Sequence, residues 1–225
     1  MKKYFLASMV SLALAGLPGL ALAESETPEV STEGMQLVDK DSRGSIYADP
    51  GVDWTIYSKV KLDNATVAFR KNWMRDQNRS RSLSGRITTS DMEKIKSELA
   101  TIFDEVFTEE LNTNGGFEIV EQAGDDVLRI TPRIVDLNIY APDTGYSGMN
   151  RSYTDSSGIM TLKLELYDSV TGDLIAVASD RQESRETGYR QWTTSGSNKA
   201  DARNMLKKWA KGLRVRLNEA TGVSP

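Results

Sequence analysis

Residues 160–180, MTLKLELYDSVTGDLIAVASD, contain the pattern that decides the fold. In the first half, apolar side chains recur at every second position: Met160, Leu162, Leu164 and Leu166. Such alternation is typical of a strand with one face turned to a core. Asp168 and Asp173 flank Ser-Val-Thr-Gly, where a carboxylate can accept turn N–H bonds and Gly172 can adopt a positive φ. Because the apolar run LIAVA resumes at once, these aspartates predict a β-hairpin, with Asp180 following its second strand.

Earlier segments also carry strand patterns. Residues 54–62 (WTIYSKVKL) and 65–69 (ATVAF) predict a pair of strands separated by an Asp-Asn turn. Residues 127–140 (VLRITPRIVDLNIY) predict a long strand of β-favouring side chains. Its apolar residues change from even to odd positions, which predicts a bulge or bend within residues 132–135.

Two amphipathic helices are predicted. The first begins at the capping box Ser-Asp-Met-Glu of residues 90–93, whose Ser and Glu side chains can each accept a backbone N–H bond, and it ends at 114–116, Asn-Gly-Gly. Its apolar stripe has spacings of three and four: Met92, Ile95, Leu99, Ile102, Phe103, Val106, Phe107 and Leu111. The second helix covers residues 198–222, with Asn198 as its cap and Gly222 as its stop. Its stripe is Ala202, Met205, Leu206, Trp209, Leu213 and Leu217.

With a further short strand at 117–121, this order predicts an α+β fold: a mainly antiparallel sheet with two principal helices packed on one face. Two segments are interpreted as loops, the basic residues 70–87 and the Gly-, Ser- and Tyr-rich residues 141–158. Residues 24–44 are polar and predict an exposed lead segment outside the fold. Residues 45–225 are expected to form a single domain.

The N-terminal residues MKKYFLASMVSLALAGLPGLALA have the order of a secretory signal, with two lysines, an apolar run and Ala-Leu-Ala before a polar segment. We expect residues 1–23 to be removed by cleavage after Ala23, which gives an exported, periplasmic protein. A transmembrane anchor is the alternative, but Pro18-Gly19 interrupts the run and no basic flank follows it. After cleavage no transmembrane segment is expected.

Composition excludes several classes of function. Loss of residues 1–23 removes two of the 28 basic residues and none of the 32 acidic ones, so the net charge falls from −4 to −6. We therefore predict no nucleic-acid partner and interpret the basic stretch around Trp73 as a polar loop. Absence of cysteine and histidine from the sequence excludes disulfides, a lipid anchor on Cys, Ser-His-Asp and Cys-His catalysis, and nearly every zinc site. We predict no catalytic residue, no cofactor and no metal site.

Two acidic patterns were natural candidates for other chemistry. Residues 39–44, DKDSRG, begin like a calcium loop, but Arg43 occupies the fifth place and Pro50 the twelfth, so we assign no calcium site. Acidic pairs such as Asp125-Asp126 could act as glycosidase carboxyls only if two of them faced each other across a cleft. Turn residues are the favoured interpretation.

Two surfaces are candidates for partner binding. The loop and the residue before it carry side chains that are common at interfaces: Tyr140, Tyr146, Met149, Arg151 and Tyr153. The second helix carries cations opposite its apolar stripe: Lys199, Arg203, Lys207, Lys208, Lys211, Arg214 and Arg216. Among these, Lys207, Lys211 and Arg214 are the predicted contacts. A disordered connector and a merely solvated cationic face are the alternatives.

Three stretches carry a family resemblance: YADPGVDWTIYSKVKLDNATVAF, LRITPRIVDLN and LELYDSVTGDLIAVASDR. With the capped helix between the first two, they resemble Domain of Unknown Function 3313, a family of uncharacterised bacterial exported proteins that includes many lipoproteins. The resemblance extends from about Gly34 over nearly the whole remaining chain. It implies a compact α+β domain in a Gram-negative cell envelope, without established activity or catalytic residues. Ala23-Glu24 stand where lipoprotein members have a Cys, so a non-lipidated protein is expected.

These observations lead to two main functional hypotheses, with an oligomeric structural protein as a third possibility. The first is a non-enzymatic accessory protein of the periplasm or cell envelope that binds another envelope component, either a protein or a polymer. The alternative is a carboxylate-dependent hydrolase acting on envelope glycans. The sequence leaves the partner and the oligomeric state open.

Overall fold

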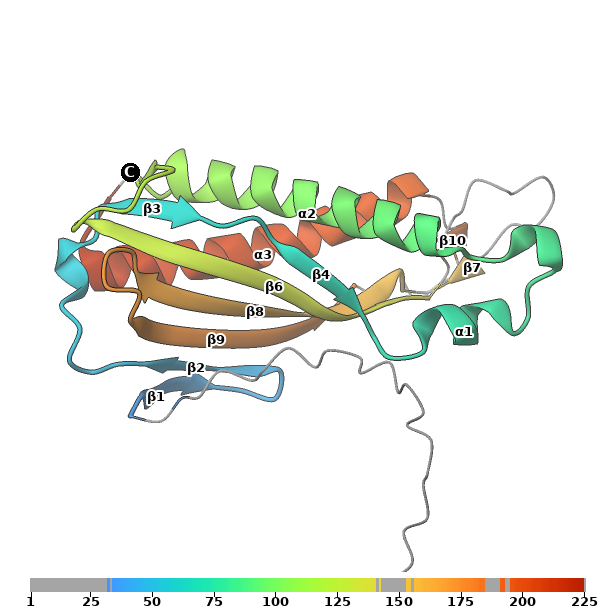
Figure 1. The fold of residues 1–225 in the computed structure, drawn as a ribbon, viewed down its shortest axis with the longest axis horizontal. Helices are drawn as coiled ribbons and strands as arrows, with labels where there is room; N and C mark the ends of the chain where they lie inside the picture. Colours follow the sequence, from blue (N-terminus) through green and yellow to red (C-terminus); the bar gives the residue numbers. More distant parts are fainter. Residues whose placement is uncertain are drawn as a thin grey trace, which may run out of the picture. The chain divides into compact units, whose positions relative to one another are not determined.

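The computed structural model describes residues 32, 34–140, 142, 153–154, 156–184, 191–192 and 195–224. Most of them form an eight-stranded sheet and two long helices (Figure 1). The sheet strands are β1 (Gln36–Lys40), β2 (Gly44–Ala48), β3 (Lys59–Leu62), β4 (Thr66–Phe69), β5 (Glu118–Ile119), β6 (Val127–Ile139), β8 (Gly158–Asp168) and β9 (Leu174–Glu183). The helices are α1 (Trp73–Asn78), α2 (Thr89–Asn112) and α3 (Ser195–Thr221), with 3₁₀ turns η1 (Trp54–Ile56) and η2 (Leu83–Gly85).

The sheet has the order β1-β2-β9-β8-β6-β3-β5, and β4 pairs with β6 beyond the end of β3. The pairs β1–β2, β2–β9, β9–β8 and β8–β6 are antiparallel. Strands β3 and β4 run parallel to β6, and β5 runs parallel to β3. Helices α2 and α3 lie alongside each other over this sheet (Figure 1). The predicted α+β class, with a mainly antiparallel sheet covered by two helices, is confirmed.

The alternating burial along β8 shows which face of the sheet the helices cover. Leu162, Leu164 and Leu166 are each at most 5% exposed, and they join side chains from both helices in one core. From α2 the core takes most of the predicted stripe: Leu99, Ile102, Phe103, Val106, Phe107 and Leu111. The period-two pattern of the strand and the period-3.6 pattern of the helix therefore meet on a common apolar surface.

The hairpin between β8 and β9 forms as predicted. The Asp168 carboxylate accepts bonds from the N–H groups of Val170 (2.9 Å) and Thr171 (2.8 Å), and Gly172 has φ +76°. Asp173 contributes through its backbone, since its C=O accepts a bond from the Asp168 N–H at 3.0 Å. The prediction for Asp180 is wrong, because β9 continues to Glu183 and Asp180 lies within the strand.

Residues 54–69 differ from the predicted strand pair. The first strand is shorter, because Trp54–Ile56 form η1, and β3 and β4 both run parallel to β6. Asp63 therefore separates two strands that both pair with β6 in the same direction, and it does not form a turn that reverses the chain. Its N–H donates to the Ile130 C=O (2.9 Å), and its carboxylate accepts a bond from Arg129 Nε (2.8 Å).

Strand β6 contains the bulge that the change from even to odd apolar positions predicted. The bulge lies slightly later in the strand than expected. The register shifts between Val135 and Asn138, and Asp136 has φ +53°. Ile134 and Leu137 are both buried as a result. An extra residue in the strand thus returns the apolar side chains to the core face.

The basic stretch 70–87 is not a simple loop, because it contains α1 and η2. Trp73 is 1% exposed, stacks on Phe69 with ring centroids 4.2 Å apart, and donates from Nε1 to the Ile139 C=O at 3.1 Å. Trp73 is therefore a core residue. A helix of six residues is too short to produce a recognisable period in sequence.

Both long helices begin earlier than predicted. In α2 the capping box is Thr88 with Asp91: the Asp91 N–H donates to Thr88 Oγ1 (3.2 Å), and the Thr88 N–H donates to Asp91 Oδ2 (2.8 Å). The predicted box at Ser90 is wrong by two residues. In α3, Asn198 lies inside the helix, while Gly222 follows its last turn with φ +76°, as predicted.

Residues 36–44 belong to the sheet and not to a lead segment. Strand β1 pairs with β2, and all five of its residues are exposed, which is why their sequence resembles a solvated tail. The predicted domain start at residue 45 is therefore too late. Residues 1–31, including the predicted signal, lie outside the described residues, as does most of 141–158; within that loop, β7 (Tyr153–Thr154) pairs with β10 (Gln191–Trp192).

Replacing Thr88 tests which residue caps α2. We expect Thr88→Ala to lower the free energy of unfolding by about 1 kcal/mol, because an orphan N–H of the first turn loses its acceptor. The matched variant Ser90→Ala should change it by less than about 0.5 kcal/mol. Urea unfolding at pH 7 measures the free energy of unfolding of both variants. A larger loss of stability in Ser90→Ala than in Thr88→Ala would show that Ser90 is the N-cap of α2.

The environment of Tyr57 predicts that the protein loses stability at alkaline pH. Its hydroxyl donates to Asp168 Oδ2 at 3.0 Å, and burial, followed by this bond, raises the pKa of Tyr57 to about 12. An unfolded tyrosine has a pKa of about 10, so the unfolded chain releases this proton first and stability falls as the pH rises through that window.

In Tyr57→Phe this part of the alkaline loss should disappear. Unfolding free energies of the two proteins, measured at intervals from pH 8 to 12, should converge as the pH rises. Curves that remain parallel would show that Tyr57 titrates normally in the folded protein.

Candidate functional site

A groove of about 370 Å³ lies between α3 and the strands β1, β2 and β9, and we call it the α3 groove. Its floor is apolar and consists of the sheet residues Ile46, Leu162, Leu164 and Ala178, and α3 adds Leu213. Its rim is polar and charged, and includes Asp39, Lys40, Asp41, Arg43, Asp180, Lys208, Trp209 and Arg216. A smaller cavity of about 100 Å³ lies between α2, α3 and the sheet, around Ile95, Ile159 and Met205.

Sheet register directs the floor residues toward α3. Ile46 pairs with Ala178, and Ala178 pairs with Leu164 on the next strand. These residues share one face of the sheet with Asp180, which bonds to Trp209 of α3. Ala178 is at the centre of this row, and its small side chain takes up less of the groove than a larger residue would.

Two glycines shape the walls. A Cβ atom on Gly44 would lie 1.8 Å from the Ser179 C=O oxygen, so only glycine permits β2 to approach β9 this closely. Gly212, inside α3, faces open space, with nothing within 4 Å of a Cβ atom at that position. Glycine weakens a helix interior, so Gly212 keeps the groove wide at some expense of helix stability.

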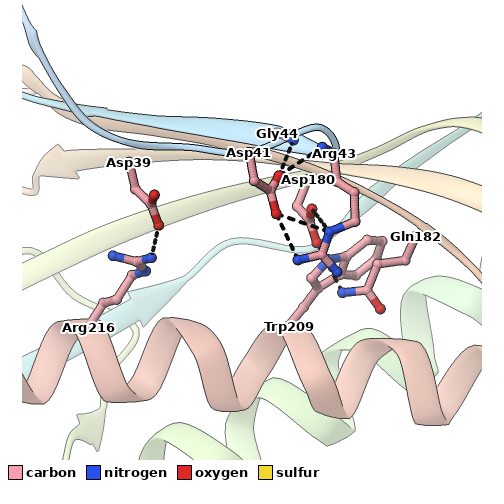
Figure 2. Close-up of polar contacts among 8 residues, drawn as sticks. All are labelled: Asp39, Asp41, Arg43, Gly44, Asp180, Gln182, Trp209 and Arg216. Carbon is pink, nitrogen blue, oxygen red and sulfur yellow. Dashed lines mark hydrogen bonds and ion pairs between the residues drawn. The ribbon is translucent and has the colours of Figure 1, made fainter.

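One end of the groove is closed by a polar network around Arg43 (Figure 2). Asp41 Oδ1 accepts bonds from the N–H groups of Arg43 (2.8 Å) and Gly44 (2.9 Å), and its Oδ2 accepts from Arg43 Nη2 (2.9 Å). The Arg43 backbone N–H, followed by its guanidinium, holds the pKa of Asp41 below its usual range. The stretch that began like a calcium loop is therefore a tight turn whose carboxylate is bound by protein donors.

Asp180 joins this network to α3 (Figure 2). Its Oδ2 accepts bonds from Trp209 Nε1 at 2.6 Å and from Gln182 Nε2 at 3.0 Å, and its Oδ1 lies 3.9 Å from Arg43 Nε. A single carboxylate thereby links β9, the β1–β2 turn and the helix. The contact fixes the position of Trp209 at the edge of the groove.

The other end is closed by an ion pair between Asp39 of β1 and Arg216 of α3 (Figure 2). Both side chains are about half exposed. Arg216 lies seven residues after Trp209, so the two polar ends are separated by about 10 Å along the helix axis. The apolar floor lies between them.

The rim carries charges of both signs. Four basic residues line the groove against three aspartates, and each aspartate already bonds to Arg43, Arg216 or Trp209. Lys40 and Lys208 form no ion pair with any of the residues that the structure describes. Lys40 pairs with Ser45, whereas Asp39 pairs with Ile46, so the Lys40 side chain leaves the sheet on the face opposite α3. Of these two ammonium groups only that of Lys208 lies on the α3 side.

Residues of the predicted loop surface are only partly brought together. The Tyr140 hydroxyl donates to Glu183 Oε1 at 2.9 Å, at the end of β9. Tyr153 belongs to β7, whereas Tyr146, Met149 and Arg151 lie outside the described residues. The loop surface therefore stays a prediction.

The predicted cationic face of α3 is in part an interhelical contact. Three of its cations pair with α2: Lys199 with Glu98 (3.1 Å), Arg203 with Glu105 (2.6 Å), and Arg214 with Glu110 (2.7 Å). Arg214 is thus largely buried against α2, and its assignment as a partner contact stays a prediction. Lys207 and Lys211 are exposed, without an ion-pair partner in the described part of the chain.

The acidic pair Asp125-Asp126 does not face a second carboxylate across the groove. Asp126 bonds to Lys59 at 3.1 Å, and this bond lowers the pKa of Asp126. Burial raises the pKa of Asp104, on α2, but that residue does not line the groove.

Sequence reasoning missed the groove because its residues come from five separate elements, β1, β2, β8, β9 and α3. Trp209 was assigned to the apolar stripe, Asp180 to the position after a strand, and residues 39–44 to an exposed lead segment. The one available signal was Gly212, a glycine inside an otherwise regular helix pattern.

The sequence model of the family described as Protein of unknown function (DUF3313) matches residues 30–213. The chain belongs to this family. The DUF3313 match includes β1, β2, β9 and most of α3, and ends just before Arg216. None of the described helices has the length and apolar composition that a membrane crossing requires.

Two solved structures show a remote likeness to this DUF3313 protein. The PelC dodecamer from Paraburkholderia phytofirmans is 12% identical, with 76% of this chain and 97% of that chain covered and a TM-score of 0.37. Protein XCC0632 from Xanthomonas campestris is 12% identical, with 78% and 91% covered and a TM-score of 0.39. No curated protein sequence matches the chain.

Charge reversal tests the ion pair that closes the groove. Arg216→Glu places two acids together, so amides of residues 36–40 should exchange hydrogen faster while global stability changes by less than about 1 kcal/mol. The double variant Asp39→Arg with Arg216→Glu should restore slow exchange. Hydrogen-exchange mass spectrometry measures both, and unchanged exchange in the single variant would show that the pair does not hold β1.

Proposed function

We propose that this protein is a non-enzymatic component of the bacterial cell envelope that binds another envelope component in the α3 groove. One observation carries the proposal: the groove combines an apolar floor with three carboxylates that already bond to protein donors. Its volume of about 370 Å³ falls within the range of ligand sites, roughly 300–1,000 Å³. Such a surface can hold a ligand by shape and contact.

Its pre-formed walls support binding. Asp180 fixes Trp209, and Asp39 fixes Arg216, so both ends of the groove are held before a ligand arrives. A site that is already ordered loses less conformational entropy on binding than one that must first be assembled. The signal-like N-terminus supports a location in the periplasm, where the component to be bound would be another protein or a polymer.

The alternative hydrolase is less well supported. A glycosidase needs a carboxylic acid of raised pKa opposite a second carboxylate. In the α3 groove the pKa of Asp41 is lowered by the bonds from Arg43, the reverse of what a general acid requires. Asp180 is likewise engaged by Trp209.

Photo-crosslinking in intact cells tests the proposal. A benzophenone amino acid in place of Gly212 projects into open space within the groove, so it should capture one specific envelope component. The same amino acid in place of Val170, an exposed residue of the β8–β9 turn, should not capture it. Mass spectrometry identifies the product.

Two results would contradict the proposed function. Equal capture from positions 212 and 170 would show that the groove is not the binding surface. Cleavage of peptidoglycan by the purified protein, abolished by Asp180→Asn, would favour the hydrolase.

A further inference from the structure

We propose that the sheet face opposite α3 binds a linear anionic polysaccharide, a chain whose sugar units carry carboxylates. This surface is separate from the α3 groove, so the inference goes beyond the proposed function and does not depend on it. It is supported by a continuous row of hydrogen-bond donors, by the solvent exposure of that row, and by the scarcity of carboxylates around it.

Strand register places one residue from each of six strands in a single line across the sheet. In the order β1, β2, β9, β8, β6 and β4, these residues are Lys40, Ser45, Ser179, Lys163, Arg133 and Thr66, and we call this line the donor row. The alternate residues Asp39, Ala178 and Leu164 face α3, so the donor row lies on the opposite face. At a strand spacing of about 4.8 Å, the row is about 24 Å long.

Every side chain of the donor row can donate a hydrogen bond. Lysine and arginine only donate, whereas the hydroxyls of serine and threonine donate or accept. None of the six side chains is buried. Arg181 adds a further cation on the same face, because it lies two residues beyond Ser179 on β9. Lys40 and Arg181 are both exposed and have no ion-pair partner among the described residues.

The two lines of described side chains that flank the donor row contain a single carboxylate, that of Glu165. Their members are Thr131, Glu165, Val177, Tyr47 and Leu37 on one side, and Val135, Thr161 and Arg181 on the other. Glu165 is buried, pairs with Arg133, and accepts a bond from the Tyr167 hydroxyl at 2.9 Å. It therefore does not repel an anion that approaches from solvent.

The acids beyond these lines are also engaged. Asp63 bonds to Arg129 at 2.8 Å, and Glu183 accepts a bond from the Tyr140 hydroxyl at 2.9 Å. Within the donor row itself, Arg133 and Lys163 lie directly opposite each other on neighbouring strands. Like charges in this arrangement destabilise a sheet, and a bound carboxylate offsets their repulsion.

The shape of the donor row favours a linear chain over a membrane surface. The flanking lines lie about 7 Å to either side, two residues along each strand, and one of them contains Val177, Tyr47 and Leu37. A planar surface would meet all three lines at once. A single polymer chain can follow the donor row, with its carboxylates at the cations and its sugar hydroxyls at Ser45 and Ser179.

A peptide fits this face less well. Its backbone N–H groups only donate, and in the donor row only the hydroxyl oxygens can accept. A peptide could instead add a strand at the free edge of β1, but the register shift between Leu37 and Asp39 interrupts that edge. Such a bulge opposes strand addition.

Isothermal titration calorimetry of the purified protein with hexagalacturonate tests the inference. We expect saturable binding that weakens as salt is added. The fully methyl-esterified hexamer has the same sugar backbone without the charges, and it should bind at least about tenfold more weakly. Hexaglutamate, an acidic peptide of equal length, should also bind at least about tenfold more weakly.

Charge reversal locates the binding surface. Lys40→Glu and Arg181→Glu should each weaken hexagalacturonate binding at least about fivefold, because each places a negative charge beside the bound chain. Lys40→Gln and Arg181→Gln remove the charge without reversing it and should weaken binding less. The matched control Lys94→Glu changes net charge equally at an exposed position of α2, on the helix-covered side of the sheet, and should leave the affinity unchanged.

The inference would be overturned by equal affinity for the charged and esterified hexamers, by equal or tighter binding of hexaglutamate, or by no binding of hexagalacturonate. Equal losses in Lys40→Glu, Arg181→Glu and Lys94→Glu would also overturn it, because they would reflect net charge and not this surface. Binding of phosphatidylglycerol vesicles in place of hexagalacturonate would assign the face to a membrane. Capture at position 212 tests the α3 groove separately, so either proposal can fail without the other.

Discussion

The limited width of two packed helices is the constraint on which the rest of this structure depends. Strands lie about 4.8 Å apart, so seven strands abreast are about 29 Å wide, whereas two helices packed side by side cover about 20 Å. Helix α2 packs near β4 and β5, and α3 bonds to β9. Strands β1 and β2 therefore extend past the helix layer, and the α3 groove is the space left at that edge.

Polar side chains hold this uncovered edge where apolar packing ends. Asp180 accepts bonds from Trp209 and Gln182, and Asp39 pairs with Arg216, so the sheet edge is fastened to α3 at two points. On the opposite side of α3, ion pairs with Glu98, Glu105 and Glu110 fasten it to α2. Exposed ion pairs contribute little to stability, but their arrangement fixes the side chains around the groove before any ligand binds. The same residues therefore serve both the architecture and the proposed site.

Sequence patterns predicted the elements whose burial alternates regularly. The hairpin around Asp168 and Gly172, and the stripe of α2 from Leu99 to Leu111, follow from periodicity and turn chemistry alone. Errors occurred where that local signal is weak or ambiguous. Strand β1 is exposed on all five residues and so has no apolar period, while Thr88 and Ser90 are both acceptable caps separated by a single residue. The local sequence does not indicate that β3 and β4 both pair in parallel with β6. An Asp-Asn pair is equally suited to a break between two parallel strands and to a turn that reverses the chain.

The sequence by itself determined the class of fold, and through the absence of histidine and cysteine it also determined which chemistry is excluded. Those properties depend on composition and on spacings of two to four residues. Only the tertiary structure decided where a ligand could bind. Asp39 and Arg216 are 177 positions apart, and Trp209 and Asp180 are 29 apart. Their contacts exist because sheet register and helix packing bring distant segments to one edge, and no local pattern encodes that meeting.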